Sequence, residues 1–382
     1  MDVLALRMAA LLLTEHLALA GRRPGSVAGV VEWFGAMQAQ DLASGLWSLG
    51  VRLPGLTSTD VVAALERGEA VRTWPMRGTL HLVPGRDARW MVELMAGRVG
   101  GAARTRRAQL GLSDADAERG AEILGTALAG GGRLSRAQCL AALDGAGLAT
   151  DGQRGYHLLG FAAQRGVVCL APNLGTEQSF VLLDDWVPGQ LVLGRDLDRD
   201  QALATIAVRY FRSHGPTTRA DLAGWTGLTL ADVRRGIDAA LADGRLAAIS
   251  IDGVDLYADP ELLDAPPIEP PAHLPAGLPA RELLVLPGFD EYLLGYKDRS
   301  LMLAPEHFQA VVPGGNGVFQ STVVRAGRVV ATWKRTTGRD RVTVDVRLLD
   351  GLPERPDQAD LERAFEPYAA FVALPVLVRP LG

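Results

Sequence analysis

The sequence predicts an α+β fold in which tandem winged-helix (helix-turn-helix) modules are followed by a mostly β C-terminal domain. An order of three helices and a two-stranded hairpin recurs up to residue 262, and β-branched residues with strand-like alternation dominate the chain beyond residue 282. A length of 382 residues suits about two to four domains. We place the domains at residues 1–112, 113–195, 196–262 and 263–382.

The first module is the loosest copy of this order. Helices are predicted over residues 4–20, 26–38 and 58–67. The strand-like runs AVRTW and TLHLV then flank the turn PMRG, which ends at Gly78. The expected order is therefore helices first and a hairpin last.

The second module repeats the order with clearer local signals. Ser135 is placed to cap a helix that ends near Gly147, and a second helix is predicted over residues 151–165. The runs VVCLA and SFVLL, joined by the turn-forming PNLGTEQ, form the hairpin.

The third module has amphipathic helices over residues 202–214, 218–227 and 229–242. Its strands RLAAISI and VDLYA flank Asp252-Gly253, which is a strong hairpin signal.

The C-terminal third begins with a proline-rich stretch at 264–279 that disfavours helix and central strand. The runs LLVLPGF, GVFQSTVVRAGRVVATWKR and RVTVDVRLL then predict strands, with a hairpin apex at Arg325-Ala326-Gly327-Arg328. One helix is expected over residues 358–369.

Composition places the chain among globular, cytoplasmic proteins. Hydrophobic residues make up 48% of it and charged residues 22%, with a formal net charge of −5. Cys139 and Cys169 are too few for a disulfide framework, which suits a reducing compartment. The apolar run that ends at Leu13 is too short for a membrane span, so we expect no membrane association. We also expect the protein to be a monomer.

Positive charge gathers at two places in this acidic chain. Residues 1–112 hold 13 arginines against nine acidic residues, and residues 320–341 hold six cations against Asp340. Such clusters are what a phosphate-binding surface requires, although solvated arginine on helix faces is the commoner origin of a single cluster. The six histidines lack metal-ligand spacing, and no glycine loop matches a nucleotide-binding pattern, so we expect neither metal nor cofactor.

Gln38 and Gln40 are the leading candidate site residues. They are separated by one small residue at the predicted end of a helix, where a change of backbone direction can point both amides the same way. Two neutral amides supply four donors and two acceptor oxygens. The alternative is that they only satisfy backbone groups at the helix end.

Other candidates carry two interpretations each. Asp41 either adds negative charge beside the glutamines or caps the helix ASGLWSLGVRL. His81 lines a cleft or is a satisfied, partly buried histidine, and Arg77 contacts phosphate or forms a structural ion pair. The hairpin residues Arg325 and Arg328, with Lys334 and Arg335 beyond them, clamp a DNA groove or protect an exposed sheet edge.

Four motifs resemble a known family. MQAQDLASGLWS, RTWPMRGTLHLVP, LPGFDEYLLGYKDRS and GRVVATWKR are similar to segments of the AlkZ-like family of winged-helix DNA glycosylases, and they span nearly the whole chain. The resemblance implies a C shape around a DNA cleft. It also implies that Gln38 and Gln40 are the catalytic pair, with Ala39 as the aliphatic residue between them.

The resemblance implies a monofunctional DNA glycosylase that excises N7- or N3-alkylated purines from double-stranded DNA. It extends to unhooking interstrand crosslinks and to self-resistance against a DNA-alkylating natural product. A non-catalytic winged-helix regulator or damage-sequestering protein is the alternative. For the marker segment from Phe289 to Ser300, which contains Asp290 and Glu291, we expect a buried polar network.

Overall fold

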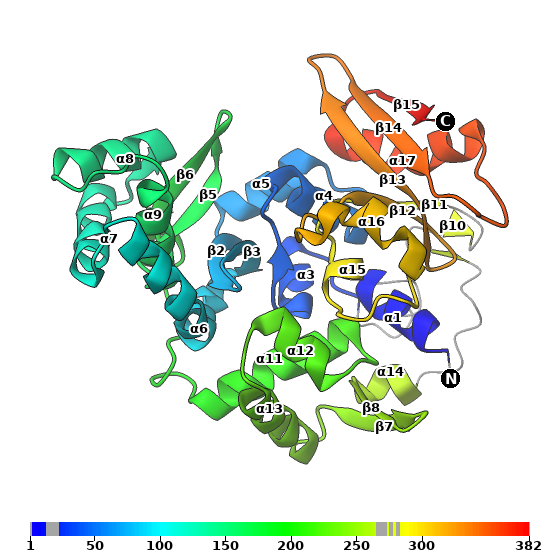
Figure 1. The fold of residues 1–382 in the computed structure, drawn as a ribbon, viewed down its shortest axis with the longest axis horizontal. Coiled ribbons are helices and arrows are strands. Elements are labelled where there is room, and N and C mark those ends of the chain that lie inside the picture. The colour runs from blue at the N-terminus through cyan, green and yellow to red at the C-terminus, as the bar shows by residue number, and fades with distance from the viewer. Residues whose placement is uncertain (1, 13–22, 265–272, 275–277, 280–282, 382) are drawn as a thin grey trace.

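The computed structural model describes residues 2–12, 23–264, 273–274, 278–279 and 283–381. It has the mixed α+β architecture that the sequence predicts (Figure 1). Most of the proline-rich stretch and the end of the predicted helix 4–20 lie outside the described residues.

The first segment contains the elements α1 (Val3–Leu12), α3 (Val27–Phe34), β1 (Met37–Gln38), α4 (Leu42–Arg52), α5 (Ser58–Glu66), β2 (Ala70–Met76) and β3 (Thr79–Pro84). The predicted helix 26–38 is too long, because Gly35 adopts φ 79° and its N–H caps the carbonyls of the last turn. Gln38 therefore lies on a strand and not at a helix end. Asp41 caps α4 by accepting the Ser44 N–H, so its capping role is confirmed.

The second segment contains α6 (Ala88–Gln109), α7 (Asp114–Leu128), β4 (Arg133–Ser135), α8 (Arg136–Gly145), α9 (Arg154–Gln164), β5 (Val168–Leu174), β6 (Glu177–Leu182) and α10 (Leu183–Trp186). Ser135 forms a capping box with Gln138, as its position predicted. A six-stranded sheet runs in the order β1-β3-β2-β5-β6-β4, so the hairpins of the first two segments meet edge to edge. Arg72 of β2 pairs with Leu170 of β5 at that junction.

The third segment contains α11 (Arg199–His214), α12 (Arg219–Thr226), α13 (Leu230–Ala242), β7 (Ala247–Ile251), β8 (Val254–Ala258) and α14 (Pro260–Asp264). Asp252 and Gly253 join β7 to β8 with φ values of 50° and 76°, which confirms the predicted tight hairpin.

The C-terminal segment contains β9 (His273–Leu274), β10 (Leu278–Pro279), β11 (Leu283–Leu286), α15 (Glu291–Leu294), α16 (Phe308–Val311), β12 (Ser321–Arg325), β13 (Arg328–Thr337), β14 (Val342–Leu348), α17 (Gln358–Val372) and β15 (Val376–Leu381). Three 3₁₀ turns cover Gly85–Asp87, Pro305–His307 and Pro313–Gly315. The main sheet has the order β11-β12-β13-β14-β15. Its last pair is parallel because α17 carries the chain back across the sheet.

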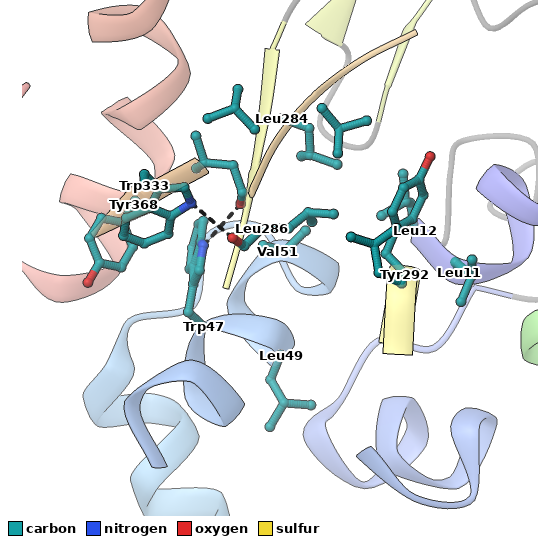
Figure 2. Close-up of a cluster of buried hydrophobic side chains, with 14 of the residues drawn as sticks. Leu11, Leu12, Trp47, Leu49, Val51, Leu284, Leu286, Tyr292, Trp333 and Tyr368 are labelled. Atoms are coloured by element: carbon teal, nitrogen blue, oxygen red, sulfur yellow. Dashed lines mark hydrogen bonds between the residues drawn. The ribbon is translucent and has the colours of Figure 1, made fainter. Parts of the chain in front are cut away.

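One hydrophobic cluster joins the first segment to the C-terminal sheet across the predicted domain boundaries. Figure 2 shows Trp47 of α4 beside Trp333 of β13 and Tyr368 of α17. The indole N–H groups of Trp47 and Trp333 donate to the carbonyls of Val285 and Leu286, at 3.1 and 2.9 Å. Residues distant in sequence therefore share one core, which holds the strand that carries Gln38.

Candidate active site

The two candidate glutamines lie on and just after the edge strand β1. Gln38 pairs with His81 of β3, and its side chain is 6% exposed, whereas Gln40 is exposed. The Ala39 N–H donates to the Leu80 carbonyl at 2.8 Å, and the Leu80 N–H donates to the Gln40 Oε1 at 3.1 Å. Gln38 and Gln40 therefore both contact β3, the first through its backbone pairing and the second through its side chain. That the two amides point the same way stays a prediction.

Arg77 holds the Gln38 side chain from the turn between β2 and β3. Its Nη2 lies 3.5 Å from the Gln38 Oε1 and 3.2 Å from the His81 Nε2. Burial lowers the pKa of Arg77, while the charge of Glu291 opposes that shift. The described hydrogen bonds of Arg77 go to Gln38 and His81 and not to a carboxylate, whereas its contact with phosphate stays a prediction.

His81 is fully buried, which contradicts the predicted direct contact with DNA. Its Nδ1 lies 2.9 Å from the Thr79 carbonyl and must donate to it, so the Nε2 accepts from Arg77. Burial and the neighbouring Arg77 charge lower the pKa of His81 to about 3. The ring therefore stays neutral and supports Arg77, as the satisfied-histidine alternative requires.

We expect an NMR titration of the histidine ring signals to show His81 neutral from pH 8 down to pH 4. A short histidine-containing peptide added to the same sample as an internal reference should titrate near about 6.5. A midpoint for His81 above pH 6 would contradict the arrangement around Arg77.

Glu291 fixes the backbone of Gln38. Its Oε1 accepts the Gln38 N–H at 2.9 Å, and its Oε2 accepts the Trp225 indole N–H at 2.9 Å and lies 3.4 Å from the His214 Nε2. Burial opposes ionisation, but the hydrogen bonds and the neighbouring His214 outweigh it and hold the pKa of Glu291 below its usual range. The site strand is thus tied to α11 and α12 through one carboxylate. Sequence reasoning marked Glu291 as part of a motif but did not identify its partners.

Asp290, the preceding residue, forms a buried ion pair with Arg52. Its two oxygens accept from the Arg52 Nη1 and Nη2, both at 2.9 Å, and the Ser48 hydroxyl donates to it at 2.6 Å. Burial raises the pKa of the carboxyl, but the Arg52 charge and the hydrogen bonds lower it by more. These contacts confirm the polar network expected for the Phe289–Ser300 segment.

The predicted basic residues of the C-terminal hairpin lie in different surroundings. Arg325 lies 3.5 Å from carboxylate oxygens of both Glu354 and Asp360, and Arg335 hydrogen-bonds to Asp41. Arg328 and Lys334 are exposed. The phosphate role predicted for Arg325 therefore competes with two carboxylates that already neutralise it.

The apex between Arg325 and Arg328 packs against the protein. The Tyr292 hydroxyl donates to the Gly327 carbonyl at 2.6 Å, and a Cβ at Gly327 would lie 2.6 Å from the Met8 sulfur of α1. This close approach requires glycine, which also adopts φ 78° here. The apex is therefore not free to enter a DNA groove as the sequence suggested.

Buried polar atoms without a partner gather on the β2–β3 hairpin. In the described part of the chain they include the side-chain atoms Arg72 Nε, Thr73 Oγ1, Trp74 Nε1, Arg77 Nε and Thr79 Oγ1. Most buried polar groups in proteins are hydrogen-bonded, so a local group of orphans calls for a water or a ligand. The hairpin that holds Gln38 thus keeps unused hydrogen-bonding capacity.

Two kinds of feature are absent from the residues that the structure describes. No three His, Cys, Asp or Glu side chains gather there in a way that could hold a metal ion. No helix in the same ranges has both the length and the apolar character needed to cross a bilayer.

This chain is similar to a known protein family and to a characterised bacterial protein. Residues 31–371 match the family described as DNA glycosylase AlkZ-like. An interstrand DNA cross-link repair glycosylase of Streptomyces sahachiroi is 31% identical over 181 residues, which are 45% of this chain and 44% of that protein. The chain thus spans less than half the length of this relative in the alignment.

A solved structure extends the similarity of the fold to the whole chain. The Streptomyces sahachiroi DNA glycosylase AlkZ aligns with a TM-score of 0.76 and 23% identity, covering 99% of this chain and 98% of that one. Because the family match covers most of the sequence, the chain belongs to the DNA glycosylase AlkZ-like family.

Proposed function

We propose that this protein is a monofunctional DNA glycosylase that excises N7- or N3-alkylated purines from duplex DNA, with Gln38 and Gln40 as its catalytic residues. The observation that carries the proposal is the fixed Gln38 amide beside the exposed Gln40. Three groups from different parts of the chain hold Gln38 in place: His81, Arg77 and Glu291. Such preorganisation is what a site that orients a water molecule needs.

The reaction needs little acid or base catalysis. Alkylation at N7 or N3 makes the purine cationic, so it leaves without protonation as its bond to C1′ breaks. The remaining tasks are to place a water at C1′ and to stabilise the developing oxocarbenium ion. Glutamine is no effective base, and its contribution is therefore positioning and electrostatics.

Each glutamine oxygen retains a lone pair that can accept a hydrogen bond from a water. An amide oxygen has two lone pairs. The Gln40 Oε1 uses one for the Leu80 N–H, and the Gln38 Oε1 lies 3.5 Å from Arg77. A water between the two amides would donate its two hydrogens to these oxygens. The lone pairs of the water oxygen would then be free to attack C1′.

The order of elements supports a winged-helix reading of the three N-terminal segments. In the second segment β4 pairs with β6 and precedes α8 and α9, so three helices (α7, α8 and α9) accompany three neighbouring strands of the six-stranded sheet. We propose that these modules and the C-terminal sheet curve around duplex DNA. The relative named as an interstrand cross-link repair glycosylase makes crosslinked DNA a candidate substrate, and self-resistance to an alkylating natural product a candidate role.

The DNA surface proposed for the C-terminal hairpin makes a prediction about salt. Lys334→Ala should reduce the slope of log affinity against log salt concentration by about 0.9, the value for one lost phosphate contact. Arg325→Ala should leave the slope unchanged, because two carboxylates already accompany this guanidinium. Fluorescence anisotropy with a short duplex measures both. Equal slopes for Lys334→Ala and the unmodified protein would remove Lys334 from the DNA surface.

Release of the free base tests the function. Incubating the protein with duplex DNA that carries N7-methylguanine should release 7-methylguanine, detected by mass spectrometry, and leave an abasic site without strand cleavage. Binding of the same duplex without release would favour the regulator or sequestering protein. Absence of binding in a mobility-shift assay would exclude both functions and favour a scaffold protein without affinity for DNA.

A further inference from the structure

Tyr156 is an exposed aromatic residue close to the site. It lies on α9 with 40% of its surface exposed. Its ring meets the edges of two other rings, that of Trp74 on β2 at 6.3 Å and that of His157 at 5.5 Å between centroids. Trp74 is 4% exposed, so the Tyr156 ring packs against a buried residue and is itself partly open to solvent.

Two arginines at the N-terminal end of α9 donate to neutral acceptors. The Gln153 Oε1 accepts from Arg106 at 2.9 and 3.3 Å, and the carbonyls of Ala149 and Leu110 accept from Arg154, both at 2.9 Å. No ion pair of either guanidinium is found among the described residues. The Asp116 carboxylate lies within electrostatic range of Arg154 but forms no ion pair with it, whereas Arg106 is held by amide oxygens. Guanidinium groups held in this way are suited to phosphate oxygens.

Two other arginines of α6 differ from Arg106 because they form ion pairs with a carboxylate. Arg104 and Arg107 both pair with Asp114, at 3.0 and 3.3 Å. Burial, followed by the charges of Arg106 and Arg107, lowers the pKa of His157, which keeps this imidazole neutral at physiological pH. Net positive charge therefore remains on Arg106 and Arg154 near the start of α9, the helix that carries Tyr156.

This surface adjoins the candidate active site. Helix α9 packs against β2, the strand that ends one residue before Arg77. Trp74 precedes Arg77 by three residues, roughly 10 Å along an extended chain. DNA advances about 3.4 Å per nucleotide along one strand, so Tyr156 lies within a few nucleotides of a residue bound at Gln38.

We propose that Tyr156 is a stacking platform for a nucleobase that is unpaired beside the lesion, while Arg106 and Arg154 hold the neighbouring phosphates. Every base has a face that can stack on an aromatic ring, and such stacking tolerates any sequence. The surface thus recognises DNA whose base pairing is disturbed. This inference rests on DNA being the substrate in the proposed function, but it does not depend on base excision.

Binding of two duplexes tests the platform. One duplex is fully paired, and the other carries a single unpaired nucleotide at the same position. Anisotropy should show that Tyr156→Ala weakens binding of the second duplex about tenfold and that of the paired duplex less than twofold, because stacking on one base accounts for roughly a tenfold change in affinity. Tyr156→Phe keeps the ring and should retain the preference.

Leu230→Ala is the matched control for loss of an exposed apolar side chain, because Leu230 is 58% exposed on the distant helix α13. Arg106→Ala should lower the salt slope by about 0.9, and Arg245→Ala should not. Equal losses on the two duplexes, or Tyr156→Ala behaving as Leu230→Ala does, would overturn the inference. A protein that keeps the Tyr156-dependent preference but releases no base would sustain the inference and refute the proposed function.

Discussion

Replacing Asp290 by asparagine should lower the free energy of unfolding by about 3–5 kcal/mol, because it leaves a buried cation without its counter-charge. Arg52 is 0% exposed, and both of its terminal nitrogens bond to this carboxylate at 2.9 Å. Urea unfolding followed by tryptophan fluorescence measures the effect, since Trp47 and Trp333 lie in the same cluster.

The exposed pair of Arg245 and Asp243 provides the control. Its atoms lie 2.9 Å apart, but both side chains are largely in solvent, so Arg245→Ala should cost less than about 1 kcal/mol. If Asp290→Asn cost no more than this control, the buried pair would not hold the first segment to the C-terminal sheet as the structure indicates.

The effect of Asp290→Asn should depend on pH in one direction. The pKa of Asp290 in the folded protein is lowered, so its contribution to stability is present above the unfolded value of about 3.9 and is lost as pH falls through the folded value. The stability difference between the unmodified protein and the variant should therefore be largest at neutral pH and shrink below about pH 4.

Helix caps and tight turns could be predicted from the sequence because they depend only on residues that are close together in the chain. Ser135 and Asp41 cap helices by accepting the N–H three residues ahead, and Asp252-Gly253 makes a two-residue hairpin. Each feature is decided within a few residues by side-chain length or by a permitted positive φ. That is why composition and spacing were enough to find them.

The surroundings of Gln38 depend on contacts that no local pattern encodes. Strand β1 has two residues and exists because β3 pairs with it. Glu291, which fixes the Gln38 N–H, is 253 residues away along the chain. The sequence marked both residues as notable, but only folding brings the Gln38 N–H within 2.9 Å of the Glu291 Oε1.

Replacing either glutamine of the pair should cost catalysis and spare DNA binding. Gln38→Ala removes the side-chain amide whose oxygen lies 3.5 Å from the Arg77 Nη2, and Gln40→Ala removes the exposed amide whose oxygen accepts the Leu80 N–H. Loss of one preorganised polar group typically lowers the rate of the chemical step about 100-fold or more. DNA affinity should change little, because neither side chain carries charge.

Gln309→Ala is a matched control for this pair. Gln309 is an exposed glutamine whose Oε1 accepts a backbone N–H, from Gly314 at 3.0 Å, much as the Gln40 oxygen accepts the Leu80 N–H. It lies on α16, outside the proposed site. The Gln309→Ala variant should excise the base at the rate of the unmodified protein. A slower rate would show that removing any exposed glutamine affects the assay.

The most direct test is the single-turnover rate of 7-methylguanine release with protein in excess and all DNA bound. We predict that Gln38→Ala and Gln40→Ala each release the base at least about 100-fold more slowly than the unmodified protein and Gln309→Ala, at equal DNA occupancy. Rates for both variants that equal the unmodified rate would contradict it.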